Sequence, residues 1–188
     1  MRLFVAIPLP EALCTELAGF AGGLDNTRWV DPDNMHLTLR FVGEIDGGEM
    51  ADLDAALAGI DAPAFDMELK GLGTFGSSKK VQALWVGVEA PEPLYRLQTK
   101  VEQAVQRAGL PPERRKFKPH VTLARFKGPP GRKLEDFLQQ YGLFRSGPIY
   151  VDRFRLYSSM LTQKGPIYRT ETEYPLQPQT SAAEQGVG

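Results

Sequence analysis

Apolar and polar residues change their spacing repeatedly along this chain, and each change predicts a new element. The first segment, Arg2 to Pro8, is a continuous apolar run closed by a proline, which is typical of a buried strand. Leu53 and Leu57 instead recur at the spacing of one helix face. The pattern predicts strands at 2–8, 29–30, 35–42, 65–72, 81–89, 119–126, 149–156 and 167–174, and helices from 10 to the glycines at 22–23, over 48–59, from 91 to 109, and over 134–140.

The order of these elements predicts an α+β fold with mainly antiparallel sheet, because strands and helices alternate irregularly. Strands 65–72 and 81–89 are joined by a polar loop at 76–80, which favours an antiparallel pair. We expect one domain over residues 1–176, and the length of the chain suits an ordinary domain or a two-lobed one. The polar, glutamine-rich segment 177–188 is expected to be a disordered tail.

Composition excludes several classes of protein. With 188 residues, of which 42% are hydrophobic and 24% charged, the chain is close to an average globular domain and unlike a disordered protein. No apolar run approaches the roughly 20 residues of a membrane span, and Pro8 and Pro10 interrupt the N-terminal run, so we expect a cytoplasmic protein without a signal peptide. The single cysteine, Cys14, excludes an internal disulfide, and with two histidines it provides too few ligands for structural zinc. We therefore expect no metal and no cofactor, and the absence of heptads favours a monomer.

Charge is distributed unevenly along the chain. Residues 1–69 hold 3 lysines and arginines against 13 aspartates and glutamates, whereas residues 70–188 hold 19 against 10. A surface built by the second part would attract an acidic partner such as nucleic acid, although ordinary solvated faces give the same pattern. The basic clusters comprise Lys79, Lys80, Arg114, Arg115, Lys116, Lys118, Arg125, Lys127, Arg132 and Lys133.

The only two histidines stand in matching sequences, 84 positions apart. His36 begins His-Leu-Thr-Leu and His120 begins His-Val-Thr-Leu, and each stretch is followed by Arg-Phe and then by a glycine. Chance placement does not account for two such matches around the only two histidines of a chain. The pattern indicates an internal repeat, in which two copies of one unit face each other.

Strand geometry indicates what such a repeat can do. In a strand, side chains two positions apart share a face, so His36 and Thr38 lie on one face and His120 and Thr122 on another. A half-buried strand with a solvated polar face would explain one of these pairs. Two such faces opposed across a groove would place two imidazoles and two hydroxyls around one small anion, an arrangement that can bind a phosphate and move protons on either side of it.

These motifs resemble those of the 2H phosphoesterase superfamily, and within it the bacterial and archaeal RNA 2',3'-cyclic phosphodiesterases, also called LigT-like proteins or 2'-5' RNA ligases. The resemblance covers nearly the whole chain. It implies a bilobal fold in which two mainly antiparallel sheets line a central cleft, with helices on the outside and no metal. Its landmarks are residues 2–7, Trp29-Val30, residues 34–43, Leu84-Trp85, residues 117–125, residues 156–159 and residues 165–168.

The residue types suit hydrolysis of a 2',3'-cyclic phosphate, which needs a base for water, an acid for the departing sugar oxygen, and donors for the phosphoryl oxygens. Histidine suits both proton transfers because its unperturbed pKa is about 6.5. Thr38 and Thr122 offer hydroxyl donors and Arg125 a charged donor. The resemblance implies that His36 is the proton donor, that His120 is the proton acceptor, and that the product carries a 2'-phosphate.

Two arginines follow the motifs. Strict alternation places Arg125 one residue out of phase with His120, so its contact with phosphate requires strand twist or a bulge, and the resemblance carries this assignment. Alternation places Arg40 on the face of the first histidine. There it would meet the backbone of RNA or pair with Glu44 or Asp46.

Aromatic residues in strands are usually part of a core, and we predict this for Trp29, Trp85 and Phe126. Phe41 is the exception, because its place near the first motif suits stacking on a base.

Three functions remain open from the sequence. The first is a phosphodiesterase that acts on RNA with 2',3'-cyclic phosphate ends or on small cyclic nucleotides. The second is a 2'-5' RNA ligase, which would use the same site in the reverse direction. The third is a non-catalytic RNA-binding module, although this chain keeps both histidines and both threonines. Fragments of tRNA, short oligonucleotides and mononucleotides all suit the site equally.

Overall fold

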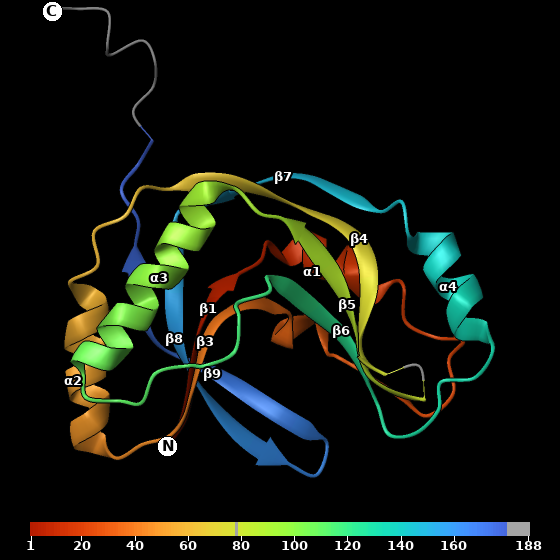
Figure 1. Cartoon of the computed structure of the whole chain (residues 1–188), viewed down its shortest axis with the longest axis horizontal. Coiled ribbons are helices and arrows are strands. Elements are labelled where there is room, and N and C mark those ends of the chain that lie inside the picture. Colours follow the sequence, from red (N-terminus) through yellow and green to blue (C-terminus); the bar gives the residue numbers. More distant parts are fainter. Residues whose placement is uncertain (78, 180–188) are drawn as a thin grey trace, which may run out of the picture.

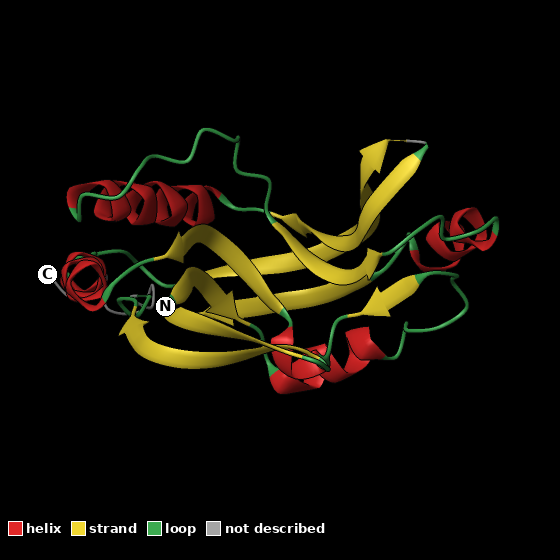
Figure 2. Cartoon of the chain, turned by 90° about the horizontal axis from the view of Figure 1, so that it is seen from below, coloured by secondary structure: helices red, strands yellow, loops and turns green. Residues whose placement is uncertain are grey.

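The computed structural model describes residues 1–77 and 79–179. Its strands form two sheets in which the neighbouring strands are antiparallel (Figure 1). Helices flank the strands on the outer sides of the molecule (Figure 2). The predicted α+β fold with two antiparallel sheets and external helices is confirmed. Within the described ranges, no helix is both long enough and apolar enough to cross a membrane.

The first sheet has four strands in the order β3-β1-β8-β9. Its strand β1 is buried on both faces: Leu3, Val5 and Ile7 join the hydrophobic core, and Phe4 and Ala6 are buried on the other face. This double burial explains the continuous apolar run in the sequence. The strands are β1 (Arg2–Pro8), β3 (His36–Glu44), β8 (Arg153–Thr162) and β9 (Gly165–Pro175).

The second sheet has five strands in the order β2-β6-β5-β4-β7. The predicted antiparallel pair around the 76–80 loop is confirmed as β4 and β5, which pair from Glu68 opposite Glu89 to Ser77 opposite Lys80. The strands are β2 (Thr27–Trp29), β4 (Phe65–Ser77), β5 (Lys80–Glu89), β6 (His120–Phe126) and β7 (Arg145–Val151).

The helices pack on the apolar faces of the sheets. Helix α2 begins with a capping box, in which Asp46 and Glu49 each accept from the other's backbone N–H. Helix α3 presents Leu94, Leu97 and Val101 to the core and contacts α2, β3 and β4, while α4 contacts β4. The helices are α1 (Glu11–Ala18), the 3-10 turn η1 (Pro32–Asn34), α2 (Gly47–Ala58), α3 (Glu92–Arg107) and α4 (Lys133–Tyr141).

The predicted single strand over 149–156 is wrong. The chain leaves the second sheet after Val151 and enters the first sheet at Arg153, so this segment belongs to two strands, β7 and β8. Buried residues stand on both sides of the crossing, with Ile149 and Val151 before it and Phe154 and Leu156 after it. Such a pattern indicates that residues are buried, and it carries no signal for the sheet that buries them.

Some element ends also differ from the prediction. The strand predicted over 35–42 continues through Gly43, which has a φ of 90° and still pairs with Leu3. The strand predicted over 65–72 extends to Ser77, and the first helix ends at Ala18, before the glycines. Because glycine adopts a positive φ without strain, Gly43 continues the strand and its pairing.

The C-terminal segment is described as far as residue 179. Gln177, at the start of the expected tail, donates its backbone N–H to Ala62 and accepts from Ala64. The rest of the expected tail, residues 180–188, lies outside the described residues.

Candidate active site

The first histidine stands at the start of β3 and is held by the residue two positions earlier. His36 Nδ1 lies 2.7 Å from the backbone carbonyl oxygen of Asn34. Because a carbonyl oxygen only accepts, Nδ1 carries the proton and Nε2 remains available to a substrate. The Asn34 side chain donates to the carbonyl of Pro166 at 2.9 Å. The backbone before β3 and the start of β9 therefore fix the imidazole together.

The second histidine is held in the same way. His120 Nδ1 lies 2.6 Å from the backbone carbonyl oxygen of Lys118, again two positions earlier. The burial of successive residues along β6 matches that of the first seven residues of β3. These two strands belong to different sheets and contact each other. The sequence repeat is thus also a structural repeat, and it presents two Nε2 atoms from two sheets.

A β-bulge interrupts both motif strands at the same place. In β3, Thr38 pairs with Ala6 of β1 and Arg40 pairs with the residue before Ala6, so Leu39 is an extra residue. In β6, Thr122 and Ala124 pair with neighbouring residues of β5, so Leu123 is the extra residue. A bulge of this kind shifts the following side chains to the other face of the strand.

The bulges decide where the two arginines lie. Leu123 and Ala124 are both buried in the core, and Arg125 then emerges exposed on the face of His120. The bulge that Arg125 requires is therefore present. In β3 the equivalent of Arg125 is Phe41, so the two Arg-Phe pairs of the sequence are offset by one position.

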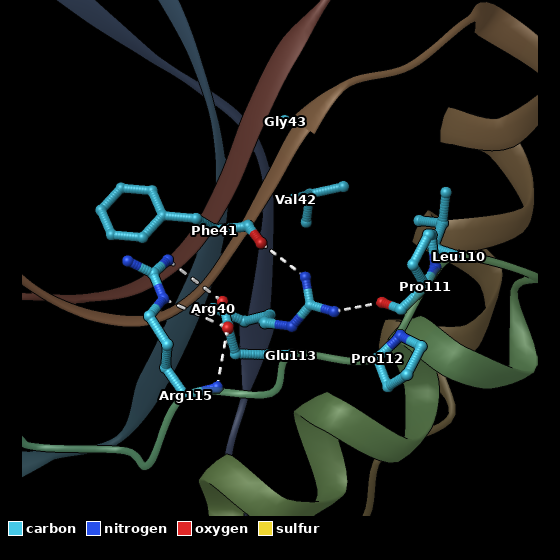
Figure 3. Close-up of a pocket in the computed structure, with 9 residues that line it drawn as sticks. All are labelled: Arg40, Phe41, Val42, Gly43, Leu110, Pro111, Pro112, Glu113 and Arg115. Carbon is cyan, nitrogen blue, oxygen red and sulfur yellow. Dashed lines mark hydrogen bonds and ion pairs between the residues drawn. The ribbon is translucent and has the colours of Figure 1, made fainter.

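Arg40 does not lie with His36, and both predicted partners, RNA and the acidic residues at 44 and 46, are wrong. It is 7% exposed and points away from the histidine face, which is the face of each sheet that carries His36 or His120. Its Nε donates to Glu102 Oε2 at 2.5 Å. Figure 3 shows its other nitrogens donating to the carbonyls of Phe41 and Pro111. Glu102 also accepts from the backbone N–H of Glu113 at 2.9 Å. Arg40 therefore fastens the segment before β6 to the edge of the first sheet.

Aromatic rings surround His36. Phe4 stacks on the imidazole with ring centroids 4.7 Å apart, and Tyr168 meets it edge-on at 5.3 Å. Tyr157 lies 6.0 Å from the imidazole and stacks on Phe4. Phe41 is 52% exposed and close to Phe4, with 6.1 Å between centroids, so it remains available for the predicted contact with a base.

A smaller aromatic group surrounds His120. Phe75 meets the imidazole edge-on at 4.7 Å, and Trp85 lies 6.3 Å away. The predicted core position of Trp85 is wrong, because Trp85 pairs with Thr122 and shares its face. A Cβ on Gly73 would lie 2.2 Å from the indole, so glycine leaves the space that the ring occupies. The prediction holds for the other two strand aromatics, which pack against the core: Trp29 and Phe126.

Burial and charge lower the pKa of both imidazoles. Burial, with smaller contributions from the charges of Arg125 and His120, lowers the pKa of His36 to about 4, and the Asn34 carbonyl opposes this shift. Burial and then Arg125 also lower the pKa of His120, against the Lys118 carbonyl. Both rings are therefore neutral near pH 7 in the free protein, with Nε2 as an acceptor. Because the charges of Arg125 and His120 in the second sheet lower the pKa of His36 in the first, these groups lie close enough to interact electrostatically.

The site combines residues that the sequence indicated with others that it did not. The missed residues, Phe4, Phe75, Tyr157 and Tyr168, come from strands far from either motif in the sequence. Phe4, Tyr157 and Tyr168 lie within landmarks of the family resemblance, which was their only signal, and Phe75 lies beyond the strand predicted over 65–72. Residues 1–77 and 79–179 contain no group of three or more His, Cys, Asp or Glu side chains arranged to hold a metal ion.

Two antiparallel sheets that each contribute a His-x-Thr strand to one site define a 2H phosphoesterase. The bulge and the Nδ1 contact are repeated in the two halves of the site. The chain belongs to the 2'-5' RNA ligase superfamily, whose family model matches residues 9–160.

Individual relatives agree with this family. A protein of Aeropyrum pernix named RNA 2',3'-cyclic phosphodiesterase is 39% identical over 143 residues, which cover 75% of this chain and 81% of the relative. The crystal structure of TT0787 of Thermus thermophilus is 30% identical with a TM-score of 0.77, over 96% of this chain and 100% of that one. The structure of E. coli LigT complexed with 3'-AMP is 27% identical with a TM-score of 0.73, over 93% and 97% of the two chains.

Proposed function

We propose that this protein hydrolyses the 2',3'-cyclic phosphate of an RNA end or a small cyclic nucleotide to a 2'-phosphate, without a metal ion. The observation that carries the proposal is the pair of imidazoles from two sheets, each with Nδ1 bound to a backbone carbonyl and with no hydrogen bond to Nε2 from residues 1–77 and 79–179. The names of the relatives support the same substrate class, since several curated relatives are named RNA 2',3'-cyclic phosphodiesterase.

In the proposed reaction, water attacks phosphorus and the bond from phosphorus to the 3' oxygen breaks. His120 Nε2 takes one proton from the water, and His36 Nε2 gives one proton to the departing 3' oxygen. The product has a 2'-phosphate and a 3'-hydroxyl. Thr38 and Thr122 donate hydrogen bonds to the non-bridging oxygens, and Arg125 adds a charged donor.

The acid role of His36 requires the imidazolium form. Burial keeps the pKa of His36 at about 4 in the free protein, so the ring is neutral before substrate binds. A phosphodiester anion next to Nε2 favours the protonated ring and raises this pKa. Substrate binding therefore prepares the proton donor.

The proposed activity is tested by product analysis. Purified protein in excess EDTA is incubated with a short RNA that ends in a 2',3'-cyclic phosphate. We expect turnover and a product with a 2'-phosphate, identified by ³¹P NMR. Activity that disappears in EDTA and returns with a divalent metal would contradict the metal-free reaction. A 3'-phosphate product would mean that the bond from phosphorus to the 2' oxygen breaks instead.

A second arm of this experiment addresses ligation, because the family model that matches the chain is that of the 2'-5' RNA ligase superfamily. An RNA with a 2',3'-cyclic phosphate is mixed with an RNA that has a 5'-hydroxyl. Formation of a 2'-5' linkage would show that the site also catalyses RNA ligation, in which the 5'-hydroxyl replaces water as the attacking group. Binding of both RNAs without hydrolysis or ligation would instead support a non-catalytic binding module.

The pH dependence of kcat/KM should follow the lowered histidine pKa values. One imidazole must be neutral and the other protonated, so activity falls when acid protonates both and when base deprotonates both. Because the pKa of each ring is lowered in the free protein, we expect a bell-shaped profile with its limbs below the unperturbed value of about 6.5.

The profile of kcat serves as the control for this prediction, because it reports the substrate complex. There the bound phosphate anion raises both pKa values, so the kcat profile should lie at higher pH than that of kcat/KM. A kcat/KM that rises steadily between about pH 7 and pH 9 would be inconsistent with two histidines of lowered pKa.

A further inference from the structure

Two arginines lie directly opposite each other at the edge of the second sheet. Arg28 of β2 pairs in register with Arg125 of β6. Residues in such a pair have Cβ atoms about 4.5–5.5 Å apart and share a face, and like charges there are destabilising. Arg28 and Arg125 are both exposed. The ion pairs found within residues 1–77 and 79–179 involve other arginines and neither of these.

The direction of Arg28 follows from its neighbour in β2. Trp29 pairs with Ala124 and packs against the core, so Arg28 points to the opposite face, which is the histidine face. Its guanidinium lies against Gly165 at the start of β9: a Cβ there would be 2.9 Å from Arg28 Nη2. Gly165 has a φ of 117°, a conformation that favours glycine. Arg28 thus reaches from the second sheet to the β8–β9 hairpin of the first.

Arg125 connects this position to the proposed reaction. Its charge contributes to the lowered pKa of His36 and His120, and it opposes the effect of burial, which raises the pKa of Tyr168; Arg125 therefore lies close to the reacting groups. Arg28 stands one strand further out on the same face. It is therefore placed beside the reacting phosphate and next to the arginine proposed to bind it.

We propose that Arg28 binds a second phosphate group of the substrate, carried by the same nucleotide or by its link to the preceding one. The inference rests on the proposed function and narrows its substrate class to nucleotides with a phosphate besides the cyclic one. A guanidinium binds phosphate through two parallel hydrogen bonds. An anion at Arg28, together with the reacting phosphate at Arg125, also removes the repulsion between the two arginines.

The test compares Arg28→Gln, Arg28→Lys and the control Arg107→Gln, which changes an exposed arginine at the end of α3. The substrates are a nucleoside 2',3'-cyclic phosphate, the same molecule with a 5'-phosphate, and a dinucleotide with a 2',3'-cyclic end. We expect Arg28→Gln to lower kcat/KM about 10- to 100-fold on a substrate with a second phosphate, and less than about twofold on the first substrate. Arg28→Lys should recover part of the loss, and Arg107→Gln should have no effect.

Thermal unfolding distinguishes binding from folding. Because Arg28 repels Arg125, Arg28→Gln should keep or raise the Tm of the free protein. A loss on the dinucleotide alone would identify the internal phosphodiester as the ligand, and a loss on the 5'-phosphorylated nucleotide as well would identify any adjacent phosphate. Equal losses on all three substrates, or no loss on any, would overturn the proposal.

A direct binding measurement separates this proposal from the proposed function. Calorimetry with a dinucleotide that ends in a 2'-phosphate compares wild type with Arg28→Gln, and it requires no turnover. Weaker binding by the variant, with equal binding of the mononucleotide 2'-phosphate, supports the second phosphate site even if the wild type hydrolyses nothing. Equal binding of the dinucleotide by both proteins would reject it.

Discussion

The His120→Ala protein is expected to hydrolyse a 2',3'-cyclic phosphate about 10²- to 10⁴-fold more slowly than wild type, because removal of a general base has effects of this size. His36→Ala should show a comparable loss on the same substrate, since the departing 3' oxygen then leaves without a proton. Steady-state kcat/KM on a nucleotide and on an RNA measures both losses. Circular dichroism and Tm confirm that each variant is folded.

The leaving group separates the two roles. A phosphodiester with a 4-nitrophenolate leaving group needs no acid but still needs a base. His36→Ala should therefore recover much of its activity on this ester, whereas His120→Ala should remain slow on both substrates. Recovery by His120→Ala alone would exchange the two roles. If neither variant recovers, the histidines bind and orient the phosphate without transferring protons.

Arg40→Ala is expected to lower the free energy of unfolding by about 3–5 kcal/mol, because it leaves the carboxylate of Glu102 without its buried partner. Arg40 is 7% exposed and Glu102 17%. Burial raises the pKa of Glu102, but the hydrogen bonds from Arg40, Glu113 and Gln106 outweigh it and lower the pKa. Urea unfolding measures the loss.

Two controls make this prediction specific. Arg96→Ala removes an exposed pair with Glu92 on α3 and should cost at most about 1 kcal/mol. The double variant Arg40→Met with Glu102→Leu removes both charges and should regain most of the stability lost in Arg40→Ala. A loss below about 1 kcal/mol in Arg40→Ala would mean that water replaces the guanidinium at Glu102.

The sequence predicted the motif strands well because their signals are local. Alternation in a strand places a histidine and the threonine two positions later on one face, and His36 with Thr38 follows this rule. The same rule failed at Arg40, because a bulge depends on the partner strand and has no local signal here. Arg125 reaches its face for the same reason.

Other parts of the site depend on contacts between distant segments. The aromatic rings at His36 come from β1, β8 and β9, so alternation within one strand does not reveal that Phe4 and Tyr168 meet. The division of 149–156 into two strands also depends on tertiary structure, since both sheets bury apolar residues equally well. Local patterns therefore predicted the two faces of each motif strand before its bulge, and they missed contacts between distant segments.

The offset of the two Arg-Phe pairs by one position has a consequence for how the site distinguishes the two ester oxygens of its substrate. A 2',3'-cyclic phosphate offers two similar ester oxygens, and the repeated Nδ1 contacts of the two histidines do not by themselves distinguish the 2' oxygen from the 3' oxygen. After the bulge the two strands differ, with a cation at Arg125 and an aromatic ring at Phe41. A nucleotide has a matching asymmetry, with an anionic phosphate at one end and a flat base at the other. The choice between the two oxygens must therefore arise where the duplicated halves are unlike, and within the motif strands the sixth position is such a place, with Phe41 in one and Arg125 in the other.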